Sequence, residues 1–431
     1  MKKLIPIILI LLETFSLFSH EKITKENLDL PTVIENTEHS EHKIICCNGM
    51  LFLKAQVFVF NSNNEAKQIP FVFIIDTGSA NSSILTDSTG NFSDLADSFC
   101  FQINNTNYLS CNAVFENFAV KNWFVREDRS RISLIKKLQK IFNDDDYHFG
   151  ILGNEVLMTK SLLLSISKGY FQWSENNPFA TCQNIINPIL DRICSTRGKR
   201  DFYQYSIYIE DNCFKSDSKD SPGLGFFNSP DKTKSRYFID TGTYFIATNL
   251  TDMYYQIKNR KYPNFLYKNE IETTTGFCKV KNASFLGQDF DSITAVAGKT
   301  PEYFKCLGNQ ILAAFDIYFD KKDTEKVQKI YFSPVDAEIY SKYRANNDST
   351  YFYPPFTFGF SVQEMSKRIS DKAFVNGKEI LPSIEIGDEI ITINDIPLNE
   401  IKDWELPDKI SIKVKKKNGE IKIIKAKKNR I

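Results

Sequence analysis

The triplet Asp-Thr-Gly occurs twice in this chain, and each copy directly follows an apolar run. The first copy and the serine after it occupy residues 76–79, behind the apolar residues 71–75. The second copy and the threonine after it occupy residues 240–243, behind the apolar residues 237–239. Apolar runs of this kind predict buried strands, so each triplet predicts a loop at the end of a strand. Two such loops predict two similar halves, each of which supplies one carboxylate to a shared site.

The two carboxylates, Asp76 and Asp240, define the chemistry that a shared site could perform. Two carboxyl groups about 3 Å apart cannot both ionise cheaply, so they share one proton and titrate as a pair. The ionised carboxylate can take a proton from a water molecule, while the protonated carboxyl group polarises a carbonyl oxygen. Such a pair predicts hydrolysis of an amide by general acid–base catalysis, without a metal ion, an organic cofactor or a nucleophilic side chain.

Small and hydroxyl-bearing residues surround each aspartate. They are Thr77, Gly78, Ser79, Thr241, Gly242 and Thr243. The glycines lack a Cβ atom, which lets two loops approach closely. The hydroxyl groups of Thr77 and Thr241 could tie one loop to the other, and those of Ser79 and Thr243 could donate hydrogen bonds to the aspartate oxygens. The plainer alternative, a pair of unrelated strand-to-turn junctions, explains one copy better than two.

A second motif repeats in the same order. Leu152-Gly153-Asn154 follows the first aspartate, and Leu307-Gly308-Asn309 follows the second at a similar spacing. Each motif leads into an apolar stretch and then into a strand-like run, at residues 162–166 and 315–320. The order and spacing indicate an internal repeat of domain size.

Together these motifs resemble those of the aspartic peptidases of the pepsin/retropepsin type, over roughly residues 45 to 340. That family carries an apolar-Asp-Thr/Ser-Gly-Ser/Thr loop and a later apolar-apolar-Gly motif in each lobe. The resemblance implies a mainly β, bilobal, double β-barrel-like fold with Asp76 and Asp240 as the catalytic pair. It also implies polypeptide substrates and no metal or other cofactor. A flap hairpin is expected within residues 99–111, with Tyr108 near its tip, and pepsin-like and tandem retropepsin-like lobes stay equally open.

Composition limits the classes of partner and of catalytic mechanism that fit the chain. The 431 residues include 54 Lys and Arg against 53 Asp and Glu, so global charge favours neither nucleic acid nor an anionic membrane as a partner. The chain has 4 histidines and no His-Glu-x-x-His motif. A serine or cysteine hydrolase would depend on His148 alone, because the other histidines lie in the polar N-terminal stretch.

The N-terminus predicts export. A basic start precedes a short apolar run, which is typical of a secretory signal peptide at residues 1–19. The run is shorter than the ~20 residues that span a bilayer, so no membrane span is expected after cleavage, and an uncleaved anchor is the alternative. The polar residues 20–44 are expected to be poorly ordered, as a prosegment or a spacer. A periplasmic, cell-surface or secreted location follows.

The 9 cysteines fall in the exported part, where disulfides are allowed. The sequence offers three local pairs, which are Cys100 with Cys111, Cys182 with Cys194 and Cys278 with Cys306. Buried thiols are the alternative, and the odd number leaves at least one cysteine outside any intramolecular pair.

The rest of the chain divides into four expected segments. They are a first peptidase lobe at residues 45–173, an inter-lobe connection at 174–200, a second lobe at 201–350 and a tail at 355–431. Within the first lobe, apolar residues at helical spacing from Ile132 to Phe142 predict one amphipathic helix packed on the sheet.

The tail is expected to form a separate small β-rich module. Its stretch at residues 387–394, Gly-Asp-Glu-Ile-Ile-Thr-Ile-Asn, resembles that of a PDZ domain. Phe358, Gly359 and Phe360 would then form the loop whose backbone N–H groups capture a peptide C-terminus. Alternating apolar residues before Asn418-Gly419 predict a β-hairpin. A purely structural cap is the alternative, because the helix usually found before the Gly-Asp turn is shortened here.

Three functions fit this sequence. The favoured one is an exported aspartic endopeptidase that hydrolyses peptide bonds through a water molecule activated by the two aspartates. The second is a non-catalytic, exported peptide-binding protein that keeps the peptidase scaffold. The third is a latent enzyme that residues 20–44 block. The sequence leaves the substrate, the subsite preferences, the disulfide pattern and the oligomeric state open.

Overall fold

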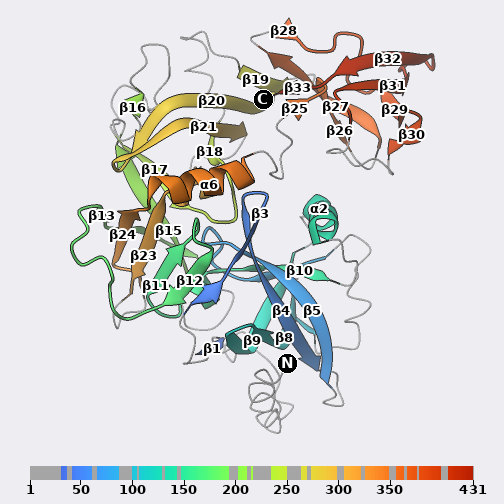
Figure 1. Cartoon of the computed structure of the whole chain (residues 1–431). Coiled ribbons are helices and arrows are strands. Elements are labelled where there is room, and N and C mark those ends of the chain that lie inside the picture. The colour runs from blue at the N-terminus through green and yellow to red at the C-terminus, as the bar shows by residue number, and fades with distance from the viewer. Residues whose placement is uncertain are drawn as a thin grey trace. The chain divides into compact units, whose positions relative to one another are not determined.

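A computed structural model gives the fold of this chain (Figure 1). It describes residues 31–35, 41–60, 66–86, 100–103, 106–128, 132–142, 147–193, 202–210, 215–216, 234–249, 264–268, 273–298, 305–321, 326–348, 356–363, 366–375, 378–398 and 406–430. The described part of the fold is mainly β, which confirms the predicted class. The predicted signal peptide lies outside the described residues. Within them, no helix is both long enough and apolar enough to cross a lipid bilayer.

The chain divides into two compact units, which we describe separately. The first comprises Met1–Ile207, Phe238–Tyr244 and Leu312–Ala345, and the second comprises Tyr208–Tyr237, Phe245–Ile311 and Asn346–Ile431. These units cut across the lobes expected from the sequence, because three segments of the expected second lobe belong to the first unit: its start up to Ile207, residues 238–244 and residues 312–345. The loop of Asp240 therefore belongs to the same unit as the loop of Asp76.

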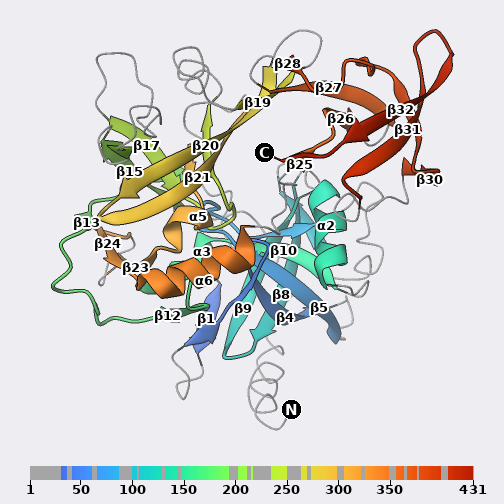
Figure 2. The ribbon, with the colours of Figure 1, turned by 45° about the horizontal axis from the view of Figure 1, so that its top comes forward.

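Six strands of the first unit close into a barrel (Figure 2). In order around the barrel they are β4 (Met50–Phe60), β5 (Ala66–Ile75), β10 (His148–Leu152), β6 (Ser83–Leu85), β9 (Phe118–Asp128) and β8 (Thr106–Phe115), and β8 pairs again with β4. Aromatic side chains fill the interior, where Phe73 lies 5.3 Å from Trp123 and 5.9 Å from Phe115 between ring centroids. Burial of these large rings stabilises the barrel and fixes the end of β5.

The predicted amphipathic helix is present as α2 (Ile132–Phe142). Its Leu138 is fully buried, and the ring of Phe142 lies 5.1 Å from that of Phe52 on β4. The prediction of a helix that packs on the sheet is therefore confirmed.

A hairpin of β7 (Cys100–Ile103) and β8 occupies the segment in which the sequence predicted a flap. Tyr108 on β8 lies opposite Phe101 on β7, two residues from the end of the hairpin, and its side chain is buried. Residues 104–105, between the two strands, lie outside the described residues. A large aromatic ring gains more from burial in the barrel than from a place at an exposed turn.

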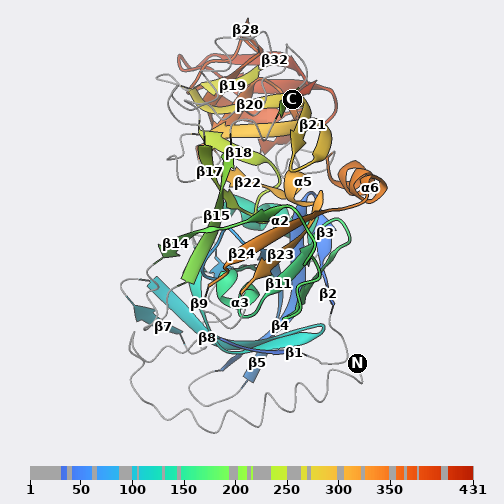
Figure 3. The ribbon, with the colours of Figure 1, turned by 90° about the vertical axis from the view of Figure 1, so that its left-hand side faces the viewer.

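A second sheet of the first unit joins the two sequence repeats (Figure 3). In order, its strands are β13 (Ile185–Ile186), β24 (Lys329–Pro334), β23 (Phe315–Asp320), β11 (Leu162–Ser165), β12 (Tyr170–Trp173) and β2 (His42–Lys43). The strands β11 and β23 are the two strand-like runs that follow the Leu-Gly-Asn motifs, and they pair antiparallel with Leu164 opposite Ile317. Equivalent strands of the two repeats thus lie side by side.

Part of the polar stretch at residues 20–44 is built into these sheets, although the sequence predicted poor order. The strand β1 (Thr32–Glu35) pairs with β9, and β2 pairs with β12. The expectation is wrong for these two short strands, because backbone pairing at a sheet edge needs few apolar side chains.

His42 on β2 is buried in an aromatic box. Its ring centroid lies 5.1 Å from that of Phe118, 4.8 Å from that of Phe171 and 5.0 Å from that of Trp173. Burial lowers the pKa of His42 below its ordinary value, and the attraction of Glu35, whose Oε1 lies 3.7 Å from Nε2, opposes this shift only in part. The folded protein therefore holds this imidazole neutral over a range in which the unfolded chain protonates it.

The free energy of unfolding is expected to fall as the pH drops below about 6.5, because the unfolded chain then binds a proton that the buried His42 does not. His42→Phe fills the box without a titrating group and is expected to flatten this dependence. Urea unfolding of both proteins at neutral and mildly acid pH measures the difference. His148→Gln is the matched control. If the free energy of unfolding of His42→Phe depends on pH as that of the wild type does, the assignment of this dependence to His42 is contradicted.

The second unit contains a long hairpin that continues into the C-terminal tail. The hairpin is formed by β20 (Thr273–Phe285) and β21 (Gln288–Gly298), and β19 (Asn264–Lys268) pairs with the outer edge of β20. On its other side β19 pairs with β27 (Arg368–Val375) of the tail. The expected separate module is therefore joined to the preceding strands by continuous backbone pairing.

The remaining strands of the second unit are short or belong to the tail. They are β18 (Ile246–Asn249), β22 (Cys306–Leu307), β16 (Lys215–Ser216), β25 (Phe356–Thr357), β26 (Phe360–Gln363), β28 (Lys378–Glu379), β29 (Glu389–Ile393), β30 (Ile396–Pro397), β31 (Lys409–Lys415), β32 (Ile421–Lys427) and β33 (Asn429–Arg430). The predicted hairpin at Asn418-Gly419 is confirmed, since β31 and β32 pair on either side of it and Gly419 has φ of +86°. Ile384, Ile390 and Ile412 are fully buried in the core that these strands enclose.

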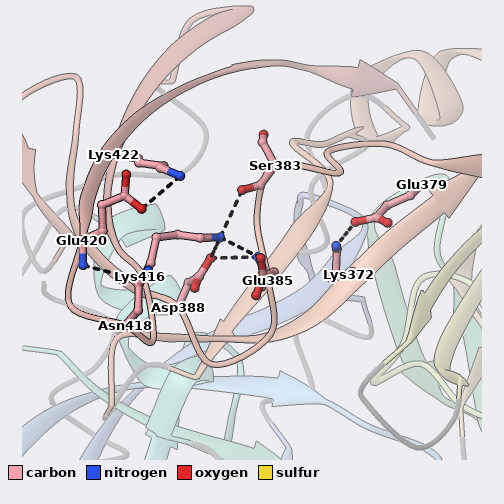
Figure 4. Close-up of polar contacts among 9 residues, drawn as sticks. All are labelled: Lys372, Glu379, Ser383, Glu385, Asp388, Lys416, Asn418, Glu420 and Lys422. Atoms are coloured by element: carbon pink, nitrogen blue, oxygen red, sulfur yellow. Dashed lines mark hydrogen bonds and ion pairs between the residues drawn. The ribbon is translucent and has the colours of Figure 1, made fainter.

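A buried ion pair anchors the Gly-Asp turn of the tail (Figure 4). Asp388 is fully buried, and its Oδ2 accepts hydrogen bonds from the Glu385 N–H (2.8 Å) and from Lys416 Nζ (2.6 Å). Lys416 Nζ also donates to the Ser383 carbonyl oxygen at 3.2 Å. A buried carboxylate needs such partners, so Lys416 is required by the turn.

Lys416→Met is expected to lower the free energy of unfolding by about 3 kcal/mol, because it leaves the Asp388 carboxylate buried without its counter-ion. Lys422 is the matched control, since its partner Glu420 lies 3.1 Å away and both side chains are about half exposed. Lys422→Met is expected to change stability by less than about 1 kcal/mol. Equal losses in the two variants, measured by urea unfolding, would contradict the role of Lys416.

Candidate functional site

The loop of Asp76 leaves the end of β5 in the wall of the barrel. The residues of β5 before it, from Phe71 to Ile75, are buried, and this strand lies between β4 and β10. The Asp76 N–H donates to the Leu152 carbonyl oxygen on β10 at 3.0 Å, and the Ser79 N–H donates back to the Asp76 carbonyl oxygen at 3.1 Å. These bonds hold the loop and its carboxylate in one conformation.

The first Leu-Gly-Asn motif clamps the other side of this loop. The Asn154 N–H donates to the Ser79 carbonyl oxygen at 2.8 Å, and the Gly153 N–H donates to Ser82 Oγ at 3.0 Å. A Cβ atom at Gly153 would lie 2.7 Å from the backbone of Asn81, so only glycine fits there. The motif is therefore structural support for the Asp76 loop.

The loop of Asp240 follows β17 (Lys234–Ile239) and repeats the same turn. The Thr243 N–H donates to the Asp240 carbonyl oxygen at 3.5 Å, as the Ser79 N–H does to that of Asp76. In addition, the Gly242 N–H donates to Asp240 Oδ1 at 2.8 Å, which orients the carboxylate.

Thr77 and Thr241 tie the two loops together by reciprocal hydrogen bonds. The Thr77 N–H donates to Thr241 Oγ1 at 3.0 Å, and the Thr241 N–H donates to Thr77 Oγ1 at 3.1 Å. The Thr77 hydroxyl donates to the Ile239 carbonyl oxygen and the Thr241 hydroxyl to the Ile75 carbonyl oxygen, both at 2.8 Å. Each hydroxyl group thus accepts one bond and donates another, and both threonines are buried. The tie that the sequence led us to expect is present in this form.

The two glycines bring the carboxyl groups together. A Cβ atom at Gly78 would lie 2.6 Å from Asp240 Cγ, and one at Gly242 would lie 2.5 Å from Asp76 Cγ, both closer than real Cβ contacts. Each carboxyl group therefore rests on the glycine of the opposite loop. Gly242 also donates its N–H to Asp240 Oδ1, so the same glycine lies beside both carboxyl groups. Bond lengths within Gly242 then place an Asp76 carboxyl oxygen at most about 8 Å from Asp240 Oδ1.

The two carboxyl groups differ in burial. Asp76 is 6% exposed, whereas Asp240 is more open to solvent. Unequal surroundings help to place the shared proton on one member of a carboxylate pair.

The sequence suggested that the hydroxyl groups of Ser79 and Thr243 donate to the aspartate oxygens, and the hydroxyl of Ser79 does not take this role. The Ser79 hydroxyl donates to the Asn81 carbonyl oxygen at 2.8 Å, so its single proton cannot also serve an aspartate oxygen. Thr243 takes part through its backbone N–H. The serine hydroxyl closes its own loop instead, as serines in turns often do.

Two side chains that the sequence reasoning did not assign also hold the first loop. Asn154 Nδ2 donates to the Thr77 carbonyl oxygen at 2.8 Å and to the Tyr203 carbonyl oxygen at 3.0 Å. Gln204 on β15 (Phe202–Glu210) donates to the Gly78 carbonyl oxygen. The repeated Leu-Gly-Asn motif was a usable signal for Asn154, because an amide can satisfy two backbone oxygens at once. Nothing in the local sequence marks Gln204.

The other predicted site lies in the tail, apart in sequence from the aspartates. Phe358 is buried in the core of the tail, Gly359 has φ of +105°, and Phe360 is partly buried. The Gly359 N–H donates to Thr357 Oγ1 at 3.0 Å. That amide is therefore already used, which argues against its part in capturing a peptide carboxylate.

Among the residues with a described position, the cysteine side chains and other metal-ligating groups form neither a metal site nor the expected Cys182 pair. No group of three or more His, Cys, Asp or Glu side chains that could hold a metal ion occurs in the described part of the chain. Cys182 Sγ donates to the Phe332 carbonyl oxygen at 3.1 Å and is a thiol, so its predicted pairing with Cys194 is wrong. The side chains of Cys100 and Cys278, and with them the other two predicted pairs, lie outside the described residues.

Comparison with protein families and with curated proteins found no match: no protein-family model matches the sequence, and the search of curated proteins gave none.

Proposed function

We propose that this chain is an exported aspartic endopeptidase in which Asp76 and Asp240 form one catalytic pair. The proposal depends on the contacts between the two loops. Each aspartate carboxyl group packs against the glycine of the other loop, and each threonine N–H donates a hydrogen bond to the hydroxyl oxygen of the other threonine. Such an arrangement costs backbone freedom and demands glycine twice. A purely structural turn needs neither feature.

The proposed reaction uses one proton shared between the two carboxyl groups. The ionised carboxylate takes a proton from a water molecule as the water oxygen attacks the carbonyl carbon of the peptide. The protonated carboxyl group donates its proton to the carbonyl oxygen, which gives a neutral tetrahedral diol. The C–N bond of the diol then breaks as the carboxyl group that took the proton of the water donates it to the leaving amine. A hydroxyl group of the diol gives its proton to the other carboxylate, which releases a carboxylic acid and restores the shared proton. Because one carboxyl group must be protonated, we expect activity to be favoured at acid to mildly acid pH.

A bilobal peptidase with a PDZ-like C-terminal domain is the architecture that we propose with this activity. The repeat supports the first part, since β7 begins at Cys100 and β19 at Asn264, the same number of residues after Asp76 and Asp240. The core of the tail and its glycine-containing bend between β25 and β26 support the second part.

The alternative is a non-catalytic peptide-binding protein. Among the described strands, β26 is paired along one edge only, with β27, so a peptide strand could be added there. Against this alternative stands the occupied amide of Gly359 and the retention of both aspartates and both glycines.

The test is cleavage of a denatured protein by the full chain at acid and neutral pH. The proposal expects fragments at acid pH, together with their loss in the aspartate variants described in the Discussion. Measurable affinity for C-terminal peptides without cleavage at any pH would favour the binding protein instead.

A further inference from the structure

The hairpin of β31 and β32 concentrates positive charge in a chain that is nearly neutral overall. Residues 409–427 contain eight lysines and a single acidic residue, Glu420, whereas the whole chain has a net charge of +1. Several lysines of the tail have acidic partners. Lys372 pairs with Glu379, Lys416 with Asp388 and Lys422 with Glu420 (Figure 4), and Lys428 pairs with Asp408. Those lysines are accounted for by the fold.

Five other lysines form one face of the hairpin. They are Lys409, Lys413, Lys415, Lys425 and Lys427, all exposed. The inward residues of the same strands, such as Ile412 and Ile424, are buried in the core, and strand alternation turns the five lysines to the opposite side. None of the five has an ion-pair partner among the described residues.

Two isoleucines interrupt this lysine face. Ile423 lies opposite Lys413 and Ile421 lies opposite Lys415 across the hairpin. They are 71% and 56% exposed, the largest values among the exposed large apolar side chains of the described residues. Exposed apolar side chains that lie among lysines suit a partner that is both anionic and apolar.

Protection of a sheet edge does not explain the arrangement. Lysines on an edge strand do prevent edge-to-edge association, and β32 ends its sheet. Three of the five lysines, however, lie on β31, which is paired on both sides with β29 and β32. The charge therefore belongs to a face and not to an edge.

We propose that this face docks the protein on the surface of an anionic phospholipid bilayer. The lysines would lie at the level of the headgroup phosphates, and Ile421 and Ile423 would enter the boundary of the acyl chains. Nucleic acid fits less well, because its phosphates have no use for aliphatic side chains and its bases stack on aromatic rings. The proposal concerns peripheral attachment and is independent of the proposed peptidase activity.

Co-sedimentation of the full chain with vesicles tests this docking. We expect binding to phosphatidylcholine vesicles that contain phosphatidylglycerol, weaker binding as salt rises, and none to phosphatidylcholine alone. The double variant Lys413→Glu/Lys425→Glu is expected to lower the affinity about tenfold or more. Ile421→Ser/Ile423→Ser is expected to lower it while leaving the dependence on salt unchanged. All four side chains are exposed, and thermal unfolding checks that each variant folds.

The matched control reverses the same number of charges elsewhere. Lys329 and Lys342 are exposed in the first unit, and Lys329→Glu/Lys342→Glu is expected to bind the vesicles like the wild type. An equal loss of vesicle affinity in this control would overturn the proposal, because net charge alone would then explain the binding. Equal binding to both vesicle types would also overturn the proposal, and so would no binding to either. A homopolymeric RNA that competes with the vesicles, and does so equally well for the wild type and for Ile421→Ser/Ile423→Ser, would overturn it too.

Discussion

Asp76→Asn and Asp240→Asn are each expected to lower kcat/KM for a denatured protein substrate by about a thousandfold or more. Asparagine keeps the size of the side chain but can neither accept the proton of the water molecule nor share a proton with its neighbour. Because each carboxyl group rests on the glycine of the other loop, both variants are expected to remove the same function.

The fold must survive these substitutions for the comparison to hold. Asparagine is isosteric with aspartate, so urea unfolding is expected to give wild-type stability within about 1 kcal/mol. Asp371→Asn in the tail is the matched control, since its carboxylate lies outside both loops and accepts hydrogen bonds from the hydroxyl groups of Ser361 and Ser370. Wild-type cleavage by either site variant would contradict the proposed function.

Thr241→Val is expected to lower the free energy of unfolding by about 2–5 kcal/mol. The change keeps the shape of the side chain but removes the hydroxyl that donates to the Ile75 carbonyl oxygen and accepts from the Thr77 N–H. Both backbone groups are then buried without a partner, and the loops lose half of their reciprocal tie. Activity is expected to fall together with stability, because the tie positions the carboxylates.

Two variants separate the lost hydroxyl from a general effect of substitution. Thr241→Ser keeps the oxygen and is expected to recover most of the stability. Thr243→Val lies two residues away, uses its backbone N–H in the loop, and is expected to stay within about 0.5 kcal/mol of the wild type. Urea unfolding of all three proteins gives the comparison, and a Thr241→Ser as unstable as Thr241→Val would contradict it.

The doubled motif carried most of what could be predicted about the site. Apolar runs ending at Asp76 and Asp240 indicated two equivalent loops, and hydroxyl residues beside them indicated a tie. The structure has the strands β5 and β17 before the loops and the threonines bonded across them. Local pattern was sufficient here, because the strand, the turn and the glycine are all specified within a few residues.

Features that depend on distant pairing could not be predicted in this way. The sheet that pairs β11 with β23 places residues far apart in sequence in one unit, and no local pattern specifies that register. The short strands β1 and β2 form because a sheet edge is available to them. Gln204 reaches the Gly78 carbonyl oxygen only because β15 lies beside the loop.

The tail contains one feature that the local sequence predicted and one that it could not predict. Alternation and the Asn-Gly turn predicted the hairpin of β31 and β32, because a period of two and a positive φ at glycine are local properties. The pairing of β27 with β19 was not predictable, since it joins the tail to a strand about a hundred residues earlier. The same alternation also turned the lysines outward and so created the face that we propose for membrane docking.

The central claim is that Asp76 and Asp240 act as one unit, and a double-mutant cycle in the cleavage assay tests it most directly. If the two carboxyl groups share one proton and one water molecule, removing the second costs nothing further, so the double variant is expected to be as slow as either single variant. Losses that multiply in the double variant would show two independent groups and would contradict the account.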